Sequence, residues 1–410
     1  MDFSVFAMVQ IYGLRPRLGN FDPMKGLFLC VVIGLQIAGF MGCAPASQPA
    51  DGDTLPTRTQ AGWAKGLVWW GDPASPDAVS LSNPRTGEPW AVVFRDSSAL
   101  RVLPGGPPVV VGNVASNGLA TLSTTHVALM AIWDPTLASW AGGAYVNFLR
   151  NEIALEQLAA GAAMDFSGQP ELDKERLLAA NPAALTIYPF GDPLAGTSVE
   201  RQIPVVPIGE YLEPHPLGRA EWMLLFGWLA GELPRAQTAF SEVAQEYESI
   251  RQALTEERHR PKVFTGSVRN GVWHAPGAQS LVAQFIADAG LENLLEAQSD
   301  TENIEIPLEQ MLQLSQEADA WGVVWDAPEG MTWSTLEAAD ARYALLAPPS
   351  GRVFAANTAV CDYFGDWVAR PDEMLRNLAQ LFHPDVVDPP QSPCFKWLTD
   401  VPSSLKTNRP

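Results

Sequence analysis

The sequence predicts an α/β protein built from two lobes that one long helix joins. Three observations predict this architecture. Short apolar runs alternate with helical stretches on both sides of residue 233, which is typical of parallel sheets covered by helices. A single apolar stripe runs along a helix between these two regions, from Pro234 to about Glu257. A short helix that leads into a strand occurs once in each region, at Glu175 and at Glu309.

The chain begins with a segment that is typical of a secretory signal. Residues 26–42 carry no charged side chain, and Lys25 precedes them. This run is short for a membrane span but long enough for the apolar part of a signal peptide. Because Met24 stands directly before Lys25, the true start is either Met1 or Met24. We expect residues 1–42 to be a signal peptide.

Cys43 follows this segment directly, as the acylated cysteine does in a bacterial lipobox. Phe40 and Met41 depart from the usual lipobox, which has Leu and a small residue there. Residues 43–60 have the Pro, Ser and Asp composition of a flexible linker. The sequence therefore predicts that Cys43 anchors the protein by lipid to a membrane, outside the cytoplasm. An ordinary signal peptide or a buried anchor helix is the alternative.

The N-terminal lobe is expected over residues 61–232 and opens with a β-rich segment. Turn residues separate its β-like runs, which are GLVWW, AVSLSN, WAVVF, LRVL and PVVVG. After Gly118 the pattern changes to strand and helix in alternation. The buried strands that this pattern predicts are residues 119–123, 183–189 and 203–209.

The helix between the lobes is expected within residues 233–260. Its apolar positions are spaced by four and three residues in turn, which places them on one face: Ala236, Phe240, Val243, Tyr247, Ile250 and Leu254. Pro234 suits the first helical turn, and Pro261 follows the end. At 1.5 Å per residue the helix spans roughly 35 Å, about the diameter of a domain.

The C-terminal lobe is expected over residues 261–390, with a tail at 391–410. Strands are predicted at 262–268, 320–325 and 352–357, and helices at 280–290 and 371–382. Cys361 and Cys394 would lie in an oxidising compartment, where they either form a disulfide or remain two buried thiols.

Composition and motifs exclude several classes of function. A formal charge of −20 argues against a nucleic-acid partner, because phosphate binding needs a basic surface. The chain contains no GxSxG, P-loop, HExxH or CxxC motif, so we expect neither an enzyme nor a bound cofactor. The five histidines lack metal-binding spacing, and no metal site is predicted. Fourteen tryptophans suit a protein that binds large, partly apolar ligands.

Five segments, in this order, resemble the ABC-transporter substrate-binding proteins of the iron-siderophore and cobalamin type. They are TLSTTHVALM (121–130), ERLLAANPAALTIY (175–188), PLGRAEWMLLFGWLAGE (216–232), VWHAPGAQSLVAQFIADAGLENLL (272–295) and DYFGDWVARPDEMLRNLAQLFHPD (362–385). The resemblance covers roughly residues 60–388. It implies two Rossmann-like lobes, one long backbone helix and a ligand cleft between the lobes. It also implies that a monomer delivers cargo to an inner-membrane permease that a separate ATPase drives.

The resemblance also implies functional residues. Trp273 would stack on the ligand, although a core tryptophan is the alternative, and Tyr145 matches a position in the ligand loop of the family's N-terminal lobe. Trp325 is a similar case to Trp273, because it lies at the C-terminal end of a predicted strand. His126 follows the first parallel strand, where it either meets the ligand or caps the next helix. Arg150 would pair with an anionic siderophore or simply be solvated.

Glu175 and Glu309 match the family's docking pattern, in which a glutamate on each lobe meets an arginine pocket of the permease. A helix-start glutamate that the helix dipole favours is the alternative for each. The cargo is expected to be a ferric siderophore or a similar metal chelate. Cobalamin, haem, a bare metal ion and a role as a surface interaction protein without transport remain alternatives.

Overall fold

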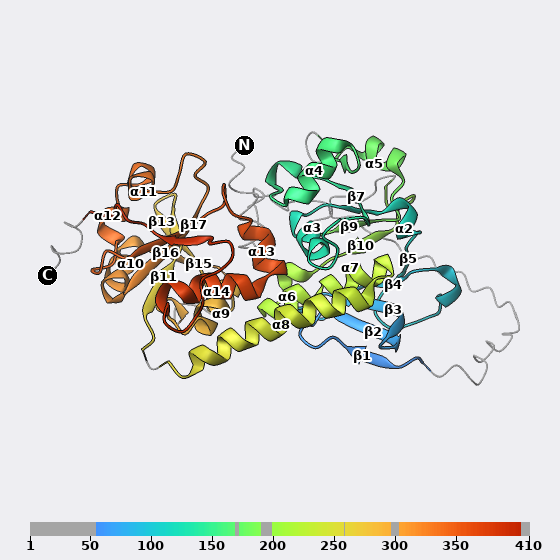
Figure 1. Ribbon diagram of the computed structural model, residues 1–410, viewed down its shortest axis with the longest axis horizontal. Coiled ribbons are helices and arrows are strands. Elements are labelled where there is room, and N and C mark those ends of the chain that lie inside the picture. Colours follow the sequence, from blue (N-terminus) through green and yellow to red (C-terminus); the bar gives the residue numbers. More distant parts are fainter. Residues whose placement is uncertain (1–54, 169–171, 190–198, 258, 297–302, 403–410) are drawn as a thin grey trace, which may run out of the picture. The chain divides into compact units, whose positions relative to one another are not determined.

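The computed structural model describes residues 55–168, 172–189, 199–257, 259–296 and 303–402, and Figure 1 labels their helices and strands. Residues 57–410 belong to one compact unit. Within the described part of this unit, the strands form three sheets of five strands and one sheet of three strands. The prediction of a mixed α/β fold is confirmed.

The first sheet begins inside residues 43–60, which the sequence assigns to a flexible linker, because residues 58–60 form its first strand. Its strands are β1 (Arg58–Gln60), β2 (Leu67–Asp72), β3 (Ser75–Ser82), β4 (Pro89–Phe94) and β5 (Pro108–Val110). Neighbouring strands are antiparallel, except that β5 is parallel to β4. The predicted strand at residues 100–103 is wrong. These residues lie in a loop, because Leu103 turns into the core of this sheet while Leu100 and Val102 are exposed.

Two buried glutamates hold the turn that joins β1 to β2. Glu221 accepts hydrogen bonds from the backbone N–H groups of residues 62–64, at 2.6 to 2.9 Å. Glu213 accepts from the N–H groups of residues 65–66, at 3.0 and 2.9 Å. Both glutamates belong to the segment that forms α6 (Pro216–Glu221) or directly precedes it. The first sheet is therefore fastened to a helix far along the chain.

Two of the five-stranded sheets share a run of four corresponding strands. The N-terminal sheet runs β10-β9-β6-β7-β8, and the C-terminal sheet runs β18-β17-β16-β11-β14. The first four strands of the N-terminal sheet correspond to the last four strands of the C-terminal sheet. β10 corresponds to β17, β9 to β16, β6 to β11 and β7 to β14. All neighbours among these corresponding strands are parallel. The chain thus contains one topological unit twice, as expected for two α/β lobes.

The strands of these two sheets are short. Those of the N-terminal sheet are β6 (Leu119–Thr121), β7 (Trp140–Gly143), β8 (Met164–Asp165), β9 (Ala184–Ile187) and β10 (Val205–Pro207). Those of the C-terminal sheet are β11 (Lys262–Thr265), β14 (Glu292–Asn293), β16 (Ala320–Trp325), β17 (Val353–Asn357) and β18 (Phe395–Trp397).

Helices connect these strands. They are α2 (Val114–Asn117), α3 (Thr124–Ala131), α4 (Glu152–Ala160), α5 (Lys174–Ala180), α6, α7 (Met223–Ala230), α8 (Leu233–Thr255), α9 (Leu281–Asp288), α10 (Leu308–Leu314), α11 (Trp333–Ala339), α12 (Tyr343–Leu346), α13 (Tyr363–Ala369) and α14 (Pro371–Phe382). Single 3₁₀ turns lie at η1 (Ser97–Ala99), η2 (Val146–Phe148), η3 (Glu210–Leu212) and η5 (Ser315–Glu317).

The long helix predicted between the lobes is confirmed as α8, drawn in yellow in Figure 1. Its predicted apolar positions are buried, apart from the half-buried Phe240. The helix packs against α7 and against α14, so it contacts elements from both halves of the chain. Glu246 of α8 is hydrogen-bonded to Arg376 of α14.

The predicted strand at 262–268 is two strands. β11 ends at Thr265, and β12 (Ser267–Arg269) then joins β13 (Val272–Pro276) and β15 (Asn303–Ile306) in the three-stranded sheet. The chain changes sheets at Gly266, whose φ of +118° is unfavourable for a residue with a Cβ. A Cβ there would also lie 2.2 Å from the carbonyl oxygen of His274.

Candidate functional site

The carboxyl ends of the parallel strands in the two sheets are the candidate position for a ligand. In α/β sheets, ligands bind outside the carboxyl ends of the strands. In the N-terminal sheet α3 follows β6, and in the C-terminal sheet α13 follows β17. These two helices pack against each other. The elements that leave the carboxyl ends of the two sheets are therefore in contact.

Tyr145 lies just after β7, at the carboxyl end of the N-terminal sheet. Its side chain is half buried, and its backbone has φ 59° and ψ 32°, the left-handed conformation. A bulky residue adopts this conformation at a cost, and such strain concentrates at binding sites. The structure thus places Tyr145 at the carboxyl end of β7 with a half-buried side chain, and its contact with a ligand stays a prediction.

Arg150 lies five residues further and is half buried. Its Nη1 donates to the carbonyl oxygens of Asn147 and Leu149, at 3.2 and 3.1 Å. Its Nε is buried and has no hydrogen-bond partner within the described residues. Burial raises the pKa of Asp362, and the positive charge of Arg150 opposes this rise. Arg150 is therefore not an ordinary solvated arginine, and it brings positive charge towards the start of α13.

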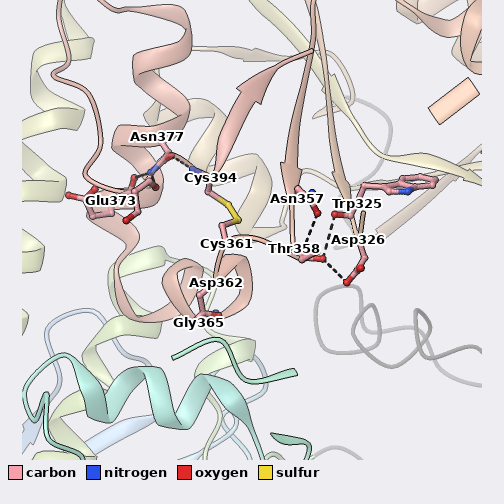
Figure 2. The surroundings of a disulfide bond; sticks show 12 residues. Trp325, Asp326, Asn357, Thr358, Cys361, Asp362, Gly365, Glu373, Asn377 and Cys394 are labelled. Atoms are coloured by element: carbon pink, nitrogen blue, oxygen red, sulfur yellow. Dashed lines mark hydrogen bonds between the residues drawn. A yellow bond between two sulfur atoms is a disulfide. The ribbon is translucent and has the colours of Figure 1, made fainter. Parts of the chain in front are cut away.

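Trp325 is the last residue of β16, at the carboxyl end of the C-terminal sheet. It is half buried, and its ring meets Tyr343 edge to face at 6.4 Å. The neighbouring strand end is tied to it, because the N–H of Thr358 donates to the Trp325 carbonyl oxygen at 2.9 Å. The Thr358 hydroxyl also donates to Asp326, at 3.2 Å. Figure 2 shows the Trp325 ring directed away from the disulfide beside it.

Cys361 and Cys394 form that disulfide, so the thiol alternative does not hold. Cys361 lies between β17 and α13, and Cys394 directly precedes β18. The backbone N–H of Cys394 donates to Asn377 of α14 at 2.7 Å. The bond therefore fixes the loop that leads from a strand end into α13, next to Asp362.

Trp273 lies in the hydrophobic core, so the core alternative describes its side chain. Its exposed fraction is 0%, and its Nε1 donates to the carbonyl oxygen of Thr265 at 3.1 Å. Its ring centroid lies 5.7 Å from those of Phe264 and Trp321. On β13 it pairs with Ile306, which is also buried. Trp273 is therefore not part of the proposed ligand site.

His274 follows Trp273 on β13 and points to the opposite face of the three-stranded sheet. It pairs with Ser267 on one side and with Glu305 on the other. Its Nδ1 lies 3.9 Å from Glu305 Oε1, and its side chain keeps 24% exposure. Burial lowers the pKa of His274, and the Glu305 charge opposes this change. Sequence reasoning missed His274, although the alternation of apolar and polar residues along β13 points to it.

His126 is a buried residue, neither exposed to a ligand nor the cap of α3. Ser123 is the residue that caps α3. The imidazole of His126 is 0% exposed, and its Nδ1 is hydrogen-bonded to Thr186 Oγ1 at 3.0 Å. Its Nε2 lies 3.9 Å from Oε2 of Glu210, and neither atom has a hydrogen-bond partner within the described residues.

The electrostatics of this buried pair follow from desolvation. Burial lowers the pKa of His126 to about 3 and raises that of Glu210 to about 7. The imidazole is therefore neutral at physiological pH, while Glu210 titrates near neutrality. The Thr125 hydroxyl donates to the other Glu210 oxygen, at 2.6 Å. The pair lies too deep to contact a ligand, and His126 does not belong to the proposed ligand site.

Glu175 and Glu309 occupy corresponding places in the two sheets. Each is exposed and lies in the first turn of a short helix, α5 and α10. α5 precedes β9, and α10 precedes β16 through η5. Since β9 corresponds to β16, the short helix that leads into a strand in each region of the sequence belongs to a repeated structural unit.

Other predictions concern parts of the chain beyond these elements. The signal peptide and Cys43 lie outside the described residues. Across the described ranges, no group of three or more His, Cys, Asp or Glu side chains is arranged to hold a metal ion. None of the helices in those ranges combines the length and apolar character that a membrane crossing requires.

The chain is similar to known proteins in sequence. Residues 154–341 match the sequence model of the family described as periplasmic binding protein. An uncharacterized lipoprotein of Methanocaldococcus jannaschii is 26% identical over 334 residues, which covers 75% of this chain and 78% of that protein.

Solved structures show the same fold. A periplasmic heme binding protein from Pseudomonas aeruginosa has a TM-score of 0.52 and 16% identity, covering 69% of this chain and 98% of that one. A periplasmic binding protein from Veillonella parvula has a TM-score of 0.51 and 15% identity, covering 65% of this chain and 91% of that one. At these identities the likeness concerns the fold alone.

Proposed function

From the match of residues 154–341 to the family model described as periplasmic binding protein, we propose that the chain is the substrate-binding lipoprotein of an ABC importer. It captures a ferric siderophore or a similar iron chelate outside the cytoplasm and delivers it to a permease. One observation supports this proposal most strongly. Two corresponding parallel sheets present half-buried aromatic side chains at their carboxyl ends, Tyr145 in one and Trp325 in the other.

The chemistry of these residues suits a metal chelate. Aromatic rings bury the apolar parts of a large ligand, and they stack on its flat groups. The guanidinium of Arg150, with its buried and unpartnered Nε, supplies positive charge for an anionic chelate. The cleft that we propose therefore lies between these strand ends, with Trp325, Tyr145 and Arg150 at its walls.

Haem or cobalamin is the second candidate cargo. His274 favours haem, because an imidazole is a common ligand of haem iron and this side chain is partly exposed, on the face of its sheet opposite Trp273. A solved relative in fold is a heme binding protein, which agrees with this alternative without deciding it. A bare metal ion has less support, since the described side chains form no three-residue metal cluster.

The partners follow from the same proposal. A lipid on Cys43 holds the protein at the outer side of a membrane, and Glu175 and Glu309 dock it as a monomer on a permease that an ATPase drives. The exposure of both glutamates at corresponding helix starts supports docking through both lobes.

A titration of intrinsic tryptophan fluorescence tests the function directly. The ligands are a ferric hydroxamate, a ferric catecholate, cobalamin, hemin and the free ions Fe³⁺ and Zn²⁺. We expect one chelate to quench the wild-type protein saturably and the free ions to leave it unchanged. Trp325→Phe should remove most of the quenching, whereas Trp63→Phe, which alters an exposed tryptophan outside the site, should keep it. Saturable binding of free ions alone, or of no ligand, would refute the proposal.

A further inference from the structure

One end of the first sheet combines the point where the linker enters with an exposed apolar loop. β1 pairs antiparallel with β2, so that Arg58 lies opposite Trp70. The pairing of β3 with β4 places Ala78 opposite Phe94. The start of β1, the β2–β3 hairpin and the end of β4 therefore share one end of the sheet. The N–H of Gly71 donates to the carbonyl oxygen of Thr57, which extends this arrangement to the first residue of the compact unit.

The loop after β4 presents two apolar side chains at that end. Val102 is 95% exposed and Leu100 is 49% exposed. The loop is nonetheless ordered around them. Asp96 caps η1, and Leu103 is buried in the core of the sheet beside Phe94.

An ion pair holds the loop to the neighbouring strand. Arg101 lies between the two exposed apolar residues in the sequence. Its Nη2 donates to Asp77 of β3 at 2.7 Å. Because its neighbours are fixed in this way, the loop displays Leu100 and Val102 outward instead of folding them into the core.

The charge at this end differs from that of the whole chain. The segments that meet there carry three basic and three acidic side chains, namely Arg58, Arg95, Arg101, Asp72, Asp77 and Asp96. They sum to zero, whereas the chain carries −20. A neutral end with exposed apolar side chains approaches a lipid surface with less repulsion than the acidic remainder of the protein.

We propose that this end of the first sheet contacts the lipid surface, with Leu100 and Val102 entering the interfacial region. This inference rests on the proposed acylation of Cys43. Thirteen residues lie between Cys43 and Thr57, and a chain of that length reaches at most about 50 Å. The end of the sheet that receives the linker is the part of the compact unit nearest to the anchor along the chain. A lipid anchor and a shallow apolar contact act together as two membrane signals.

The test places a fluorescent probe on the loop in the full-length, processed protein. Val102→Cys is labelled with an environment-sensitive dye, and Leu345→Cys, which replaces a residue of α12 that is 59% exposed, is the matched control. The label reacts at one position, since Cys361 and Cys394 are bonded and Cys43 is acylated under the proposal. Each protein is reconstituted in phosphatidylcholine vesicles that contain nitroxide-labelled lipid.

We expect at least about two-fold stronger quenching at position 102 than at position 345, because an interfacial side chain enters roughly 5–10 Å into the headgroup region. Equal quenching at the two positions, in protein that floats with the vesicles, would overturn the contact and leave the anchor intact. Protein that does not float with the vesicles would overturn both the anchor and the contact. A blue-shifted but unquenched probe at position 102 would show that protein covers the loop, and would also overturn the proposal.

Discussion

Trp273 and Trp325 both lie in the C-terminal lobe, on β13 and β16, but their surroundings differ. Trp273 is fully buried among aromatic rings, whereas Trp325 keeps part of its ring exposed at a strand end. Truncating a fully buried tryptophan removes its packing and leaves a cavity. The two tryptophans should therefore respond differently to the same substitution.

We expect Trp273→Ala to lower the free energy of unfolding by about 3–5 kcal/mol. Trp325→Ala should cost less stability and weaken cargo binding by about 10- to 100-fold. Chemical denaturation and a binding titration on both variants measure these effects. A Trp273→Ala protein of normal stability that has lost cargo affinity would return Trp273 to the ligand site.

The buried pair of His126 and Glu210 makes stability depend on pH in two opposite ways. Burial raises the pKa of Glu210 from 4.5 to about 7, so the folded protein holds a proton that the unfolded chain has released. Stability from this group therefore falls as pH rises from 4.5 to 7. Burial lowers the pKa of His126 from 6.5 to about 3, so stability from the imidazole rises with pH between 3 and 6.5.

Together the two groups should give a stability plateau between pH 4.5 and 6.5, where their opposite effects cancel, and a decline between pH 6.5 and about 7. Thermal unfolding from pH 4 to 8 measures this profile. Glu210→Gln should remove the decline above pH 6.5, whereas Glu305→Gln, at an exposed position, should keep it. A Glu210→Gln profile that matches the wild type would show that Glu210 does not titrate in this range.

Sequence reasoning predicts the positions of some candidate residues and misses others for a physical reason. Tyr145 and Trp325 follow parallel strands, and their place at strand ends depends only on the order of the elements. Whether a side chain points inward depends on strand pairing, which the sequence of β13 alone does not specify. Trp273 was therefore assigned to the ligand, while His274, one residue further and on the opposite face, was overlooked.

At the scale of elements, Gly266 allows the chain to pass from β11 into the three-stranded sheet. Its positive φ and the nearby His274 carbonyl oxygen both disfavour a larger residue. Gly330 has a similar φ, +106° against +118°, but no atom lies within 4 Å of the place its Cβ would take. Comparing the same substitution at these two glycines therefore distinguishes the energetic cost of the backbone conformation from that of a steric clash.

We expect Gly330→Ala to cost about 1–2 kcal/mol, as a left-handed backbone does. Gly266→Ala should cost clearly more, because the chain must also move away from the carbonyl oxygen at 2.2 Å. Urea denaturation of the two variants gives the difference. Equal losses would mean that the backbone relaxes around Gly266 without further cost.

Elements with strong local signals were predicted closely. β16 and α14 have the bounds that the sequence indicated, since a buried apolar run and a helix that begins at Pro371 are unambiguous. The predicted strand at 100–103 failed because its apolar residues turn to different sides of an irregular loop. The break at Gly266 was missed because its cause, the carbonyl oxygen of His274, is a tertiary contact.

At the scale of the molecule, the repeated sheet presents Glu175 and Glu309 at corresponding helix starts. We expect Glu175→Lys/Glu309→Lys to abolish cargo uptake while cargo affinity stays within about three-fold, because charge pairs at a rim set orientation and encounter. Glu152→Lys/Glu337→Lys, at two other exposed positions on helices, carries the same charge change as a control. Transport into membrane vesicles and a binding titration measure the two quantities.

Normal uptake by the first double variant would remove both glutamates from the docking site. Loss of uptake in the control as well would mean that total charge, and not these two positions, governs docking.

The glutamates that fasten the first sheet also determine when that sheet can be completed. Between 147 and 159 residues separate the turn at residues 62–66 from Glu213 and Glu221. At about 5–20 residues per second, the ribosome needs roughly 7–30 s to make that stretch. During this delay water must satisfy the N–H groups of the turn. The turn that is made first is thus among the last parts of the first sheet to reach its final contacts.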